Sequence, residues 1–263
     1  MLNKLLKYEL KSIFKFLMIF YGLSLLFSAL ARVFLSVEGS LIMEIIGEIF
    51  RGAAISMMFS SVINNVMRMW VRYKQNFFGD ESYLTHTLPI KKSTLMLSKI
   101  IASVITLVCS TLVVAITIFI AYYSKENLEA LKALFIVLED MHNFKILPFA
   151  IMLFAVLFLE FLNIILCGFA GITLGHRMGN AKTGFSILFG MIVYSISQIS
   201  VLAVAFLFGF VNGDIMNLFF TNSAVSSDVF YTLIFICVAA YLALNVVMVF
   251  VNTKLFKKGV NVE

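Results

Sequence analysis

The chain has 263 residues, of which 62% are hydrophobic and 13% charged, and its formal net charge at pH 7 is +6. Soluble domains are roughly 45 to 50% apolar and about 25% charged, so this composition excludes an ordinary soluble protein and predicts a chain that crosses a membrane several times. No basic patch with interleaved aromatic residues occurs in a soluble module, so the positive charge does not indicate a nucleic-acid partner.

Residues 1–15 precede the first long apolar stretch and predict an amphipathic helix. Lysines recur along them at helical spacing, and the opposite side is apolar. Such a helix is expected to lie in the membrane surface with its lysines toward anionic lipid headgroups. The alternative is a first span that begins early and carries solvated lysines. The lysines of this interfacial helix are Lys4, Lys7, Lys11 and Lys15.

Six apolar stretches are long enough to cross a bilayer as helices, which takes about 20 residues at 1.5 Å per residue. They are apolar throughout, whereas barrel strands would alternate, so the predicted class is all-α. They leave no room for a soluble domain, and we expect a single transmembrane domain over residues 1–263. The predicted spans are Phe16–Leu35, Gly52–Val71, Ile100–Tyr123, Leu147–Leu174, Gly184–Val211 and Val229–Val251.

The distribution of basic residues predicts the orientation of these spans. With the N-terminus inside, 15 of the 20 Lys and Arg residues fall in inner segments. Cytoplasmic loops carry an excess of Lys and Arg, so both termini are expected in the cytoplasm.

Residues 77–99, FFGDESYLTHTLPIKKSTLMLSK, form the one long polar stretch and lie between the second and third spans, on the predicted cytoplasmic side. Asp80 and Glu81 place negative charge at the start of a short helix, and Pro89 ends it. The helix is predicted to lie across the base of the bundle and to present apolar side chains to a partner. The alternative is a connector that covers its own spans. The apolar side consists of Tyr83, Leu84, Thr87 and Leu88.

This loop resembles the first cytoplasmic loop in permease subunits of type-2 ATP-binding-cassette (ABC) exporters, in particular bacterial peptide-exporter-like ones. In that family an aromatic and acidic lead-in is followed by a leucine pair, a Leu-Pro, a basic pair and a lysine at the mouth of the next span. The layout of an interfacial helix, six spans and two inner termini is also similar, although the outer segment between spans three and four is rather long here. The matching residues are Phe77, Phe78, Asp80, Glu81, Leu84, Leu88, Pro89, Lys91, Lys92 and Lys99.

The resemblance implies that the short helix is a coupling helix seated in a groove of a separate ATPase. The chain itself has no G-x-x-x-x-G-K-[ST] phosphate loop, so it is not expected to be an enzyme or to hold a catalytic, cofactor or metal site. ATP and Mg would be bound by two ABC ATPase subunits, and a second permease, identical or homologous, completes the complex. The residues implied in ATPase coupling are Phe78, Asp80, Glu81, Tyr83, Leu84, Leu88 and Pro89.

Glu160 lies near the middle of the fourth span, where a buried charge costs about 2.5 to 3.5 kcal/mol on the insertion scale. Asn163 is one turn further on, so the two polar groups share a face that should turn away from lipid. That face could line the substrate path or join two permeases. Alternatively, Glu160 is neutral and hydrogen-bonded inside one bundle.

Two further features concern packing and the outer mouth. Gly171 and Gly175 have the spacing that lets helices approach closely. In the resembling family a re-entrant hairpin near residues 212–228 seals the outer mouth, which makes Leu218, Phe219 and Phe220 candidates for an outer gate. Three cysteines within the spans are expected to be small apolar residues rather than disulfide partners: Cys109, Cys167 and Cys237.

These expectations combine into a permease of an ATP-driven exporter in the bacterial cytoplasmic membrane. A hydrophobic or amphipathic peptide is the expected cargo, because small permeases of this appearance resemble those that expel antimicrobial or toxin-like peptides; a lipid or drug is the alternative cargo. The alternative function is a non-transporting membrane scaffold or sensor. An intramembrane enzyme is disfavoured, since Glu160 is the one acid available in the bilayer interior.

Overall fold

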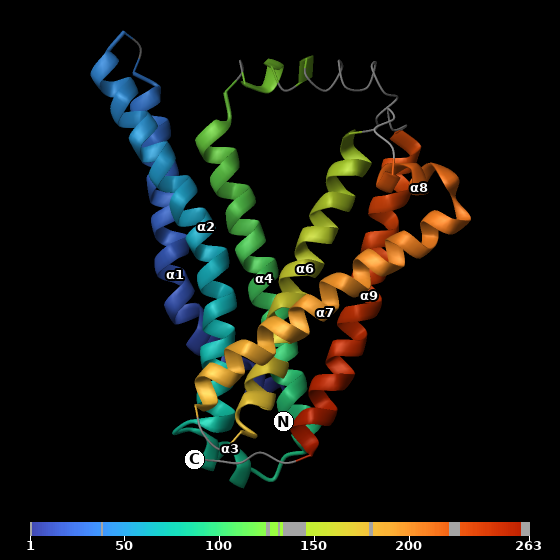
Figure 1. Cartoon of the computed structure of the whole chain (residues 1–263). Coiled ribbons are helices and arrows are strands. Elements are labelled where there is room, and N and C mark those ends of the chain that lie inside the picture. The colour runs from blue at the N-terminus through green and yellow to red at the C-terminus, as the bar shows by residue number, and fades with distance from the viewer. Residues whose placement is uncertain are drawn as a thin grey trace. The chain divides into compact units, whose positions relative to one another are not determined.

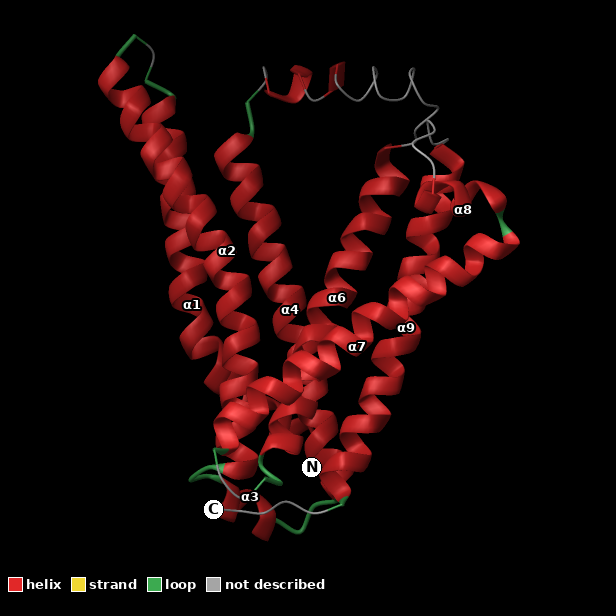
Figure 2. Cartoon of the chain, in the orientation of Figure 1, coloured by secondary structure: helices red, strands yellow, loops and turns green. Residues whose placement is uncertain are grey.

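The structure is a computed structural model that describes residues 2–37, 39–124, 127–130, 132–133, 146–178, 181–220 and 227–258. Every regular element in these ranges is a helix, which confirms the all-α class (Figures 1 and 2). The helices are α1 (Leu2–Leu35), α2 (Leu41–Phe78), α3 (Ser82–Thr87), α4 (Lys92–Tyr122), α6 (Ile146–Gly175), α7 (Lys182–Val211), α8 (Gly213–Phe220) and α9 (Ser227–Lys257).

Five of these helices, α1, α4, α6, α7 and α9, are long and apolar enough to cross a membrane. The chain therefore has the make-up of a multi-pass membrane protein. The predicted second span, Gly52–Val71, lies within α2, which is 38 residues long but is not among these five. A sixth span therefore stays a prediction, and so does the location of the termini.

The chain divides into two compact units. The first contains residues 1–73 and 89–130, and the second contains residues 74–88 and 131–263. The last residues of α2 and the whole of α3 therefore belong to the second unit, although the chain then returns to α4 in the first. The action of both units as one transmembrane domain stays a prediction.

In the first unit α1 packs along α4, and α2 contacts both. Ser110 of α4 shares a hydrogen bond with the Tyr21 hydroxyl of α1 at 2.6 Å and accepts another from Asn65 of α2 at 2.8 Å. Aromatic rings join α1 to α2, where Phe34 stacks on Phe50 with 5.4 Å between centroids.

Helix α1 is continuous from Leu2 to Leu35, so the proposed interfacial segment and the first span form one helix. The four lysines of that segment are exposed, whereas Ile13 and Leu17 on its apolar side are fully buried. This segregation agrees with an amphipathic segment. Its position in the membrane surface stays a prediction.

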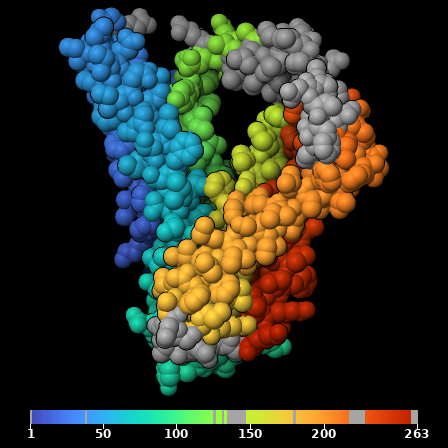
Figure 3. Space-filling model, in the orientation of Figure 1, coloured from blue at the N-terminus to red at the C-terminus, as the bar shows by residue number. Residues whose placement is uncertain are grey.

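In the second unit α6 packs against both α7 and α9. The contact with α7 depends on small residues: a Cβ added to Gly171 would lie 2.5 Å from the Gly190 Cα atom, and one added to Gly175 would overlap Ser186. The predicted role of Gly171 and Gly175 in close helix approach is confirmed. Much of the other side of α7 stays exposed, as the space-filling view shows along the helix (Figure 3).

Two asparagines of α9 bind α6 at matching positions. The Asn245 Nδ2 donates to the Leu159 carbonyl and the Asn252 Nδ2 donates to the Leu166 carbonyl, each over 3.0 Å. Seven residues separate the two donors and also the two acceptors, so the side chains form two equivalent cross-links along the pair. At the other end of α9, Ile215 of α8 packs against Val229 and Ile236.

Candidate functional site: the α3 loop and the polar groups of the long helices

The short helix predicted after Asp80 and Glu81 is present as α3. It ends at Thr87, and Leu88 is extended with φ −64° and ψ 134°. The ring of a following proline disfavours helical geometry at the preceding residue, which explains why the helix stops before Pro89.

Aromatic contacts hold the α3 loop on the second unit. The Phe77 ring lies 4.3 Å from the Phe256 ring near the end of α9, and the Phe78 ring lies 4.4 Å from the His176 ring just after α6. His86 of α3 contacts the Phe77 carbonyl oxygen through Nε2 at 3.2 Å. The loop therefore has a buried base formed by the ends of α6 and α9.

A polar contact adds α7 to this base. The Lys74 ammonium, near the end of α2, donates to the Thr183 hydroxyl at the start of α7 over 2.9 Å. Arg177 also donates to the Leu255 carbonyl oxygen over 2.6 Å and so joins the end of α6 to the end of α9. We call the group Phe77, Phe78, His86, His176 and Phe256 the aromatic seat.

The opposite side of α3 is exposed. Tyr83 is 75% exposed and Leu84 is 71% exposed, and Leu88 is 44% exposed. Phe78, by contrast, is only 1% exposed, so it lies in the seat and not on the outward face. Large apolar side chains that gather on an exposed surface are typical of a site that contacts a partner or the membrane. The outward residues among those predicted to couple to an ATPase are Asp80, Glu81, Tyr83, Leu84, Leu88 and Pro89.

Glu9 is a functional candidate that was not predicted from the sequence. Its carboxylate is buried in the first unit, where it accepts a hydrogen bond from the Lys99 ammonium and lies 3.2 Å from the Arg72 guanidinium. The signal was present, because Glu9 falls on the apolar stripe with Ile13 and Leu17. An acid at such a position needs buried cations nearby.

The two intramembrane polar candidates differ in their surroundings. Asn163 is fully buried, its Oδ1 accepts a hydrogen bond from the Ser197 hydroxyl at 2.9 Å, and its amide nitrogen faces Asn245 at 3.5 Å. Its side chain is therefore engaged within the second unit. Glu160 is half-buried and accepts a hydrogen bond from the Tyr194 hydroxyl at 3.3 Å.

The candidate outer gate is described only in part. Leu218, Phe219 and Phe220 end α8, but their side chains lie outside the described residues, as do residues 221–226. A re-entrant hairpin over residues 212–228 stays a prediction. Among the cysteines, all three are free thiols, which confirms that they form no disulfides.

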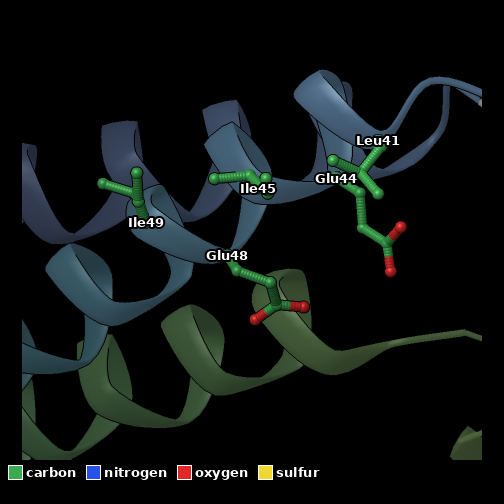
Figure 4. A pocket seen from close by; sticks show the side chains of 5 residues that line it. All are labelled: Leu41, Glu44, Ile45, Glu48 and Ile49. Carbon is green, nitrogen blue, oxygen red and sulfur yellow. The ribbon is translucent and has the colours of Figure 1, made fainter.

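A hollow of about 560 Å³ lies on the first turns of α2, lined by side chains of that one helix (Figure 4). Its carboxylates come from Glu44 and Glu48, and its apolar lining comes from Leu41, Ile45 and Ile49. Glu48 already pairs with Arg51 at 2.6 Å. The hollow therefore lacks the convergent polar groups of an enclosed ligand site.

Comparisons of the chain with protein-family models, with curated proteins and with solved structures found no match. The functional assignment therefore depends on the sequence and on the geometry of these sites.

Proposed function

We propose that the chain is the permease subunit of an ATP-driven ABC exporter in the bacterial cytoplasmic membrane. The observation that carries this proposal is the two-sided geometry of α3: Tyr83 and Leu84 project outward, while Phe77 and Phe78 anchor the same segment in the aromatic seat. A connector that merely covers its own spans has no need to expose its largest apolar side chains.

The seat also suggests how force would reach the membrane helices. A partner that presses on Tyr83 and Leu84 would transmit force to the Phe77 and Phe78 rings, because these rings end α2 a few residues before α3. They contact residues next to the ends of α9 and α6, so the push would tilt those helices. Closely packed rings transmit displacement because interiors have low compressibility.

The proposed topology has six spans, with α2 as the second. Near one end of the first unit Phe50 of α2 stacks on Phe34 of α1, and near the other end Arg72 of α2 pairs with Glu9 of α1. Helix α2 therefore runs antiparallel to α1 for 22 residues between these contacts, about 33 Å at 1.5 Å per residue. That length matches a hydrocarbon layer about 30 Å thick, which supports a crossing.

The complex would contain two permeases, identical or homologous, and two ABC ATPase subunits that bind ATP and Mg. The permease would supply the path and perform no covalent chemistry. An amphipathic or hydrophobic peptide is the proposed cargo, with a lipid or drug as the alternative. The basic bias of the inner segments places the α3 loop and both termini in the cytoplasm in this proposal.

Co-purification tests the partner. The tagged chain from its native membrane should retain, in stoichiometric amount, a protein that carries a G-x-x-x-x-G-K-[ST] phosphate loop. The double change Tyr83→Asp and Leu84→Asp should release it, because charges would enter an apolar contact. The matched control is Tyr8→Asp, since Tyr8 is similarly exposed at 72% but lies on α1. A dimer that holds no ATPase, and whose behaviour survives the double change, would favour a scaffold or sensor.

Cysteine labelling tests on which side of the membrane α3 lies. Leu84→Cys in a chain whose three native cysteines are replaced by alanine should react with a membrane-impermeant maleimide only from the cytoplasmic side. Reaction of intact cells with the reagent at this position would place α3 outside and exclude coupling to a cytoplasmic ATPase.

A further inference from the structure

Glu160 lies at the centre of α6, 14 residues after Ile146 and 15 residues before Gly175. At 1.5 Å per residue it is about 21 to 23 Å from either helix end. If α6 crosses a hydrocarbon layer about 30 Å thick, the carboxyl group lies near its mid-plane. An ionisable group at that depth is costly and is usually retained for a task.

The carboxylate has no cationic partner within the described part of the chain. Its hydrogen bond comes from the Tyr194 hydroxyl at 3.3 Å, and no described Lys, Arg or His side chain pairs with it. Glu9 shows the contrast, because its carboxylate is neutralised by both Lys99 and Arg72. Among the described residues, the buried Glu9 carboxylate therefore has two cationic partners and the half-buried Glu160 carboxylate has none.

The bond from Tyr194 does not explain why a glutamate is present. Tyr194 donates and Glu160 accepts, so a glutamine side chain could accept the same bond through its amide oxygen. A glutamine would also avoid the cost of about 2.5 to 3.5 kcal/mol assigned to a charged residue at this depth. What glutamate adds over glutamine is a carboxyl group that can carry a negative charge.

The surroundings of Glu160 suit an organic cation. Glu160 and Tyr194 are both half-buried, so the carboxylate is not sealed inside the unit. Tyr241 of α9 belongs to an apolar cluster against which Leu159, the neighbour of Glu160, packs, and its hydroxyl donates to the Gln198 amide oxygen at 2.8 Å. Aromatic rings beside a carboxylate bind ammonium and guanidinium groups by ion pairing and cation–π attraction. The nearby Leu157 is 46% exposed and offers apolar contact.

We propose that Glu160, with Tyr194 beside it, binds a lipophilic organic cation, that is, a positively charged group carried on an apolar body. The assignment of this cation as the charged part of the cargo rests on the proposed function. The binding itself needs neither ATP nor an ATPase, so it can be measured on the permease alone.

Equilibrium binding of radiolabelled tetraphenylphosphonium to the purified full-length chain in lipid nanodiscs tests the site. Tetraphenylborate serves as the probe control because it has the same size and shape with the opposite charge. The wild-type chain should bind the cation saturably, and Glu160→Gln should weaken that binding at least about tenfold. Glu48→Gln is the matched control variant, since it also removes one negative charge but from a carboxylate paired with Arg51. Its affinity should equal that of the wild type, and tetraphenylborate binding should not change in either variant.

Several results would overturn the proposal. These are equal cation binding by wild type and Glu160→Gln, equal losses in Glu160→Gln and Glu48→Gln, or no saturable cation binding by a folded wild-type chain. Unchanged cation binding together with loss of dimers in Glu160→Gln would assign Glu160 to a contact between subunits instead. The thermal unfolding of each variant shows whether it is folded.

The outcome separates this inference from the proposed function. Cation binding that depends on Glu160, in a chain that retains no ATPase, would support the cation-binding site and contradict the proposed exporter function. A retained ATPase without cation binding that depends on Glu160 would support the exporter function and contradict the cation-binding site.

Discussion

Glu9 and Lys99 form a buried ion pair although 90 residues separate them in the chain. Arg72 approaches the same carboxylate with its Nη2 atom at 3.2 Å, so one acid holds two cations from different helices. The three residues lie near the start of α1, in the last turns of α2 and in the second turn of α4. One carboxylate therefore fixes the same end of all three helices in the first unit.

Removing the carboxylate should destabilise the protein strongly. Glu9→Ala leaves Lys99 and Arg72 close together without a counter-charge, and breaking a buried pair in this way costs about 3 to 5 kcal/mol. Denaturant unfolding in detergent measures the change. Glu48→Ala breaks a more exposed pair with Arg51 and should cost less than about 1 kcal/mol. Similar losses in both variants would contradict the central role of Glu9.

Even the smallest side chain at Gly171 should disturb the second unit. The added methyl of Gly171→Ala would lie 2.5 Å from the Gly190 Cα atom, so α6 and α7 must separate, at about 1 to 3 kcal/mol. Gly22→Ala on α1 meets open space and should instead gain about 0.5 to 1 kcal/mol through lower chain entropy. Thermal unfolding of the two variants should therefore move in opposite directions. A stabilised Gly171→Ala would show that the helices do not meet there.

The seat and the outward face of α3 should respond differently to truncation. Phe78→Ala removes a ring that is 1% exposed, and the loss should be about 3 to 5 kcal/mol. Leu84→Ala changes a side chain that is 71% exposed and should stay within about 0.5 kcal/mol. Hydrogen exchange over residues 79–88 is the second measurement, and it should quicken in Phe78→Ala alone. Equal exchange in both variants would mean that the seat does not hold the loop.

The asparagine cross-links between α9 and α6 should contribute modestly and independently. Each of Asn245→Leu and Asn252→Leu removes a bond to a carbonyl oxygen on α6, and such bonds within membranes average about 0.6 kcal/mol and reach about 1.7. The sites are seven residues apart, about 10 Å along the helix, so the double variant should show the sum of the two losses. Unfolding of the two single variants and the double variant gives the comparison. A double loss well above that sum would reveal coupling between them.

The length and apolarity of the long stretches predicted much of this fold, because the membrane imposes a simple rule on helix length and polarity. The short helix before Pro89 followed from local charge and proline chemistry, and Gly171 and Gly175 followed from their spacing. The sequence predicted helix α2 as a membrane span less clearly than the other long helices. Its apolar stretch was visible, but the acids and arginines at its ends leave it more polar than the five long apolar helices.

Pairings between distant residues were not readable in the same way. Phe77 meets Phe256 across 179 positions of chain, and nothing in either segment specifies the other. The assignment of residues 74–88 to the second unit was equally hidden, since sequence order places them between two helices of the first. Glu160 was identified from the sequence because a charged residue near the middle of a span is energetically costly. Its pairing with Tyr194 could not be predicted, because it depends on the angle at which α6 and α7 pack.

The close backbone contact between Gly171 and Gly190 also limits how α6 and α7 can move. It lies near one end of the pair, and 21 residues of α7 follow Gly190 up to Val211, about 32 Å of helix. A contact between two glycine backbones has no interlocking side chains, so we expect it to allow rotation more readily than the hydrogen bonds from Tyr194 and Ser197 further along α7. A rotation of about 10° around it would shift the far end of α7 by about 5 to 6 Å, so a displacement at the start of α7, near the aromatic seat, would be about two to three times larger at the opposite end of the helix.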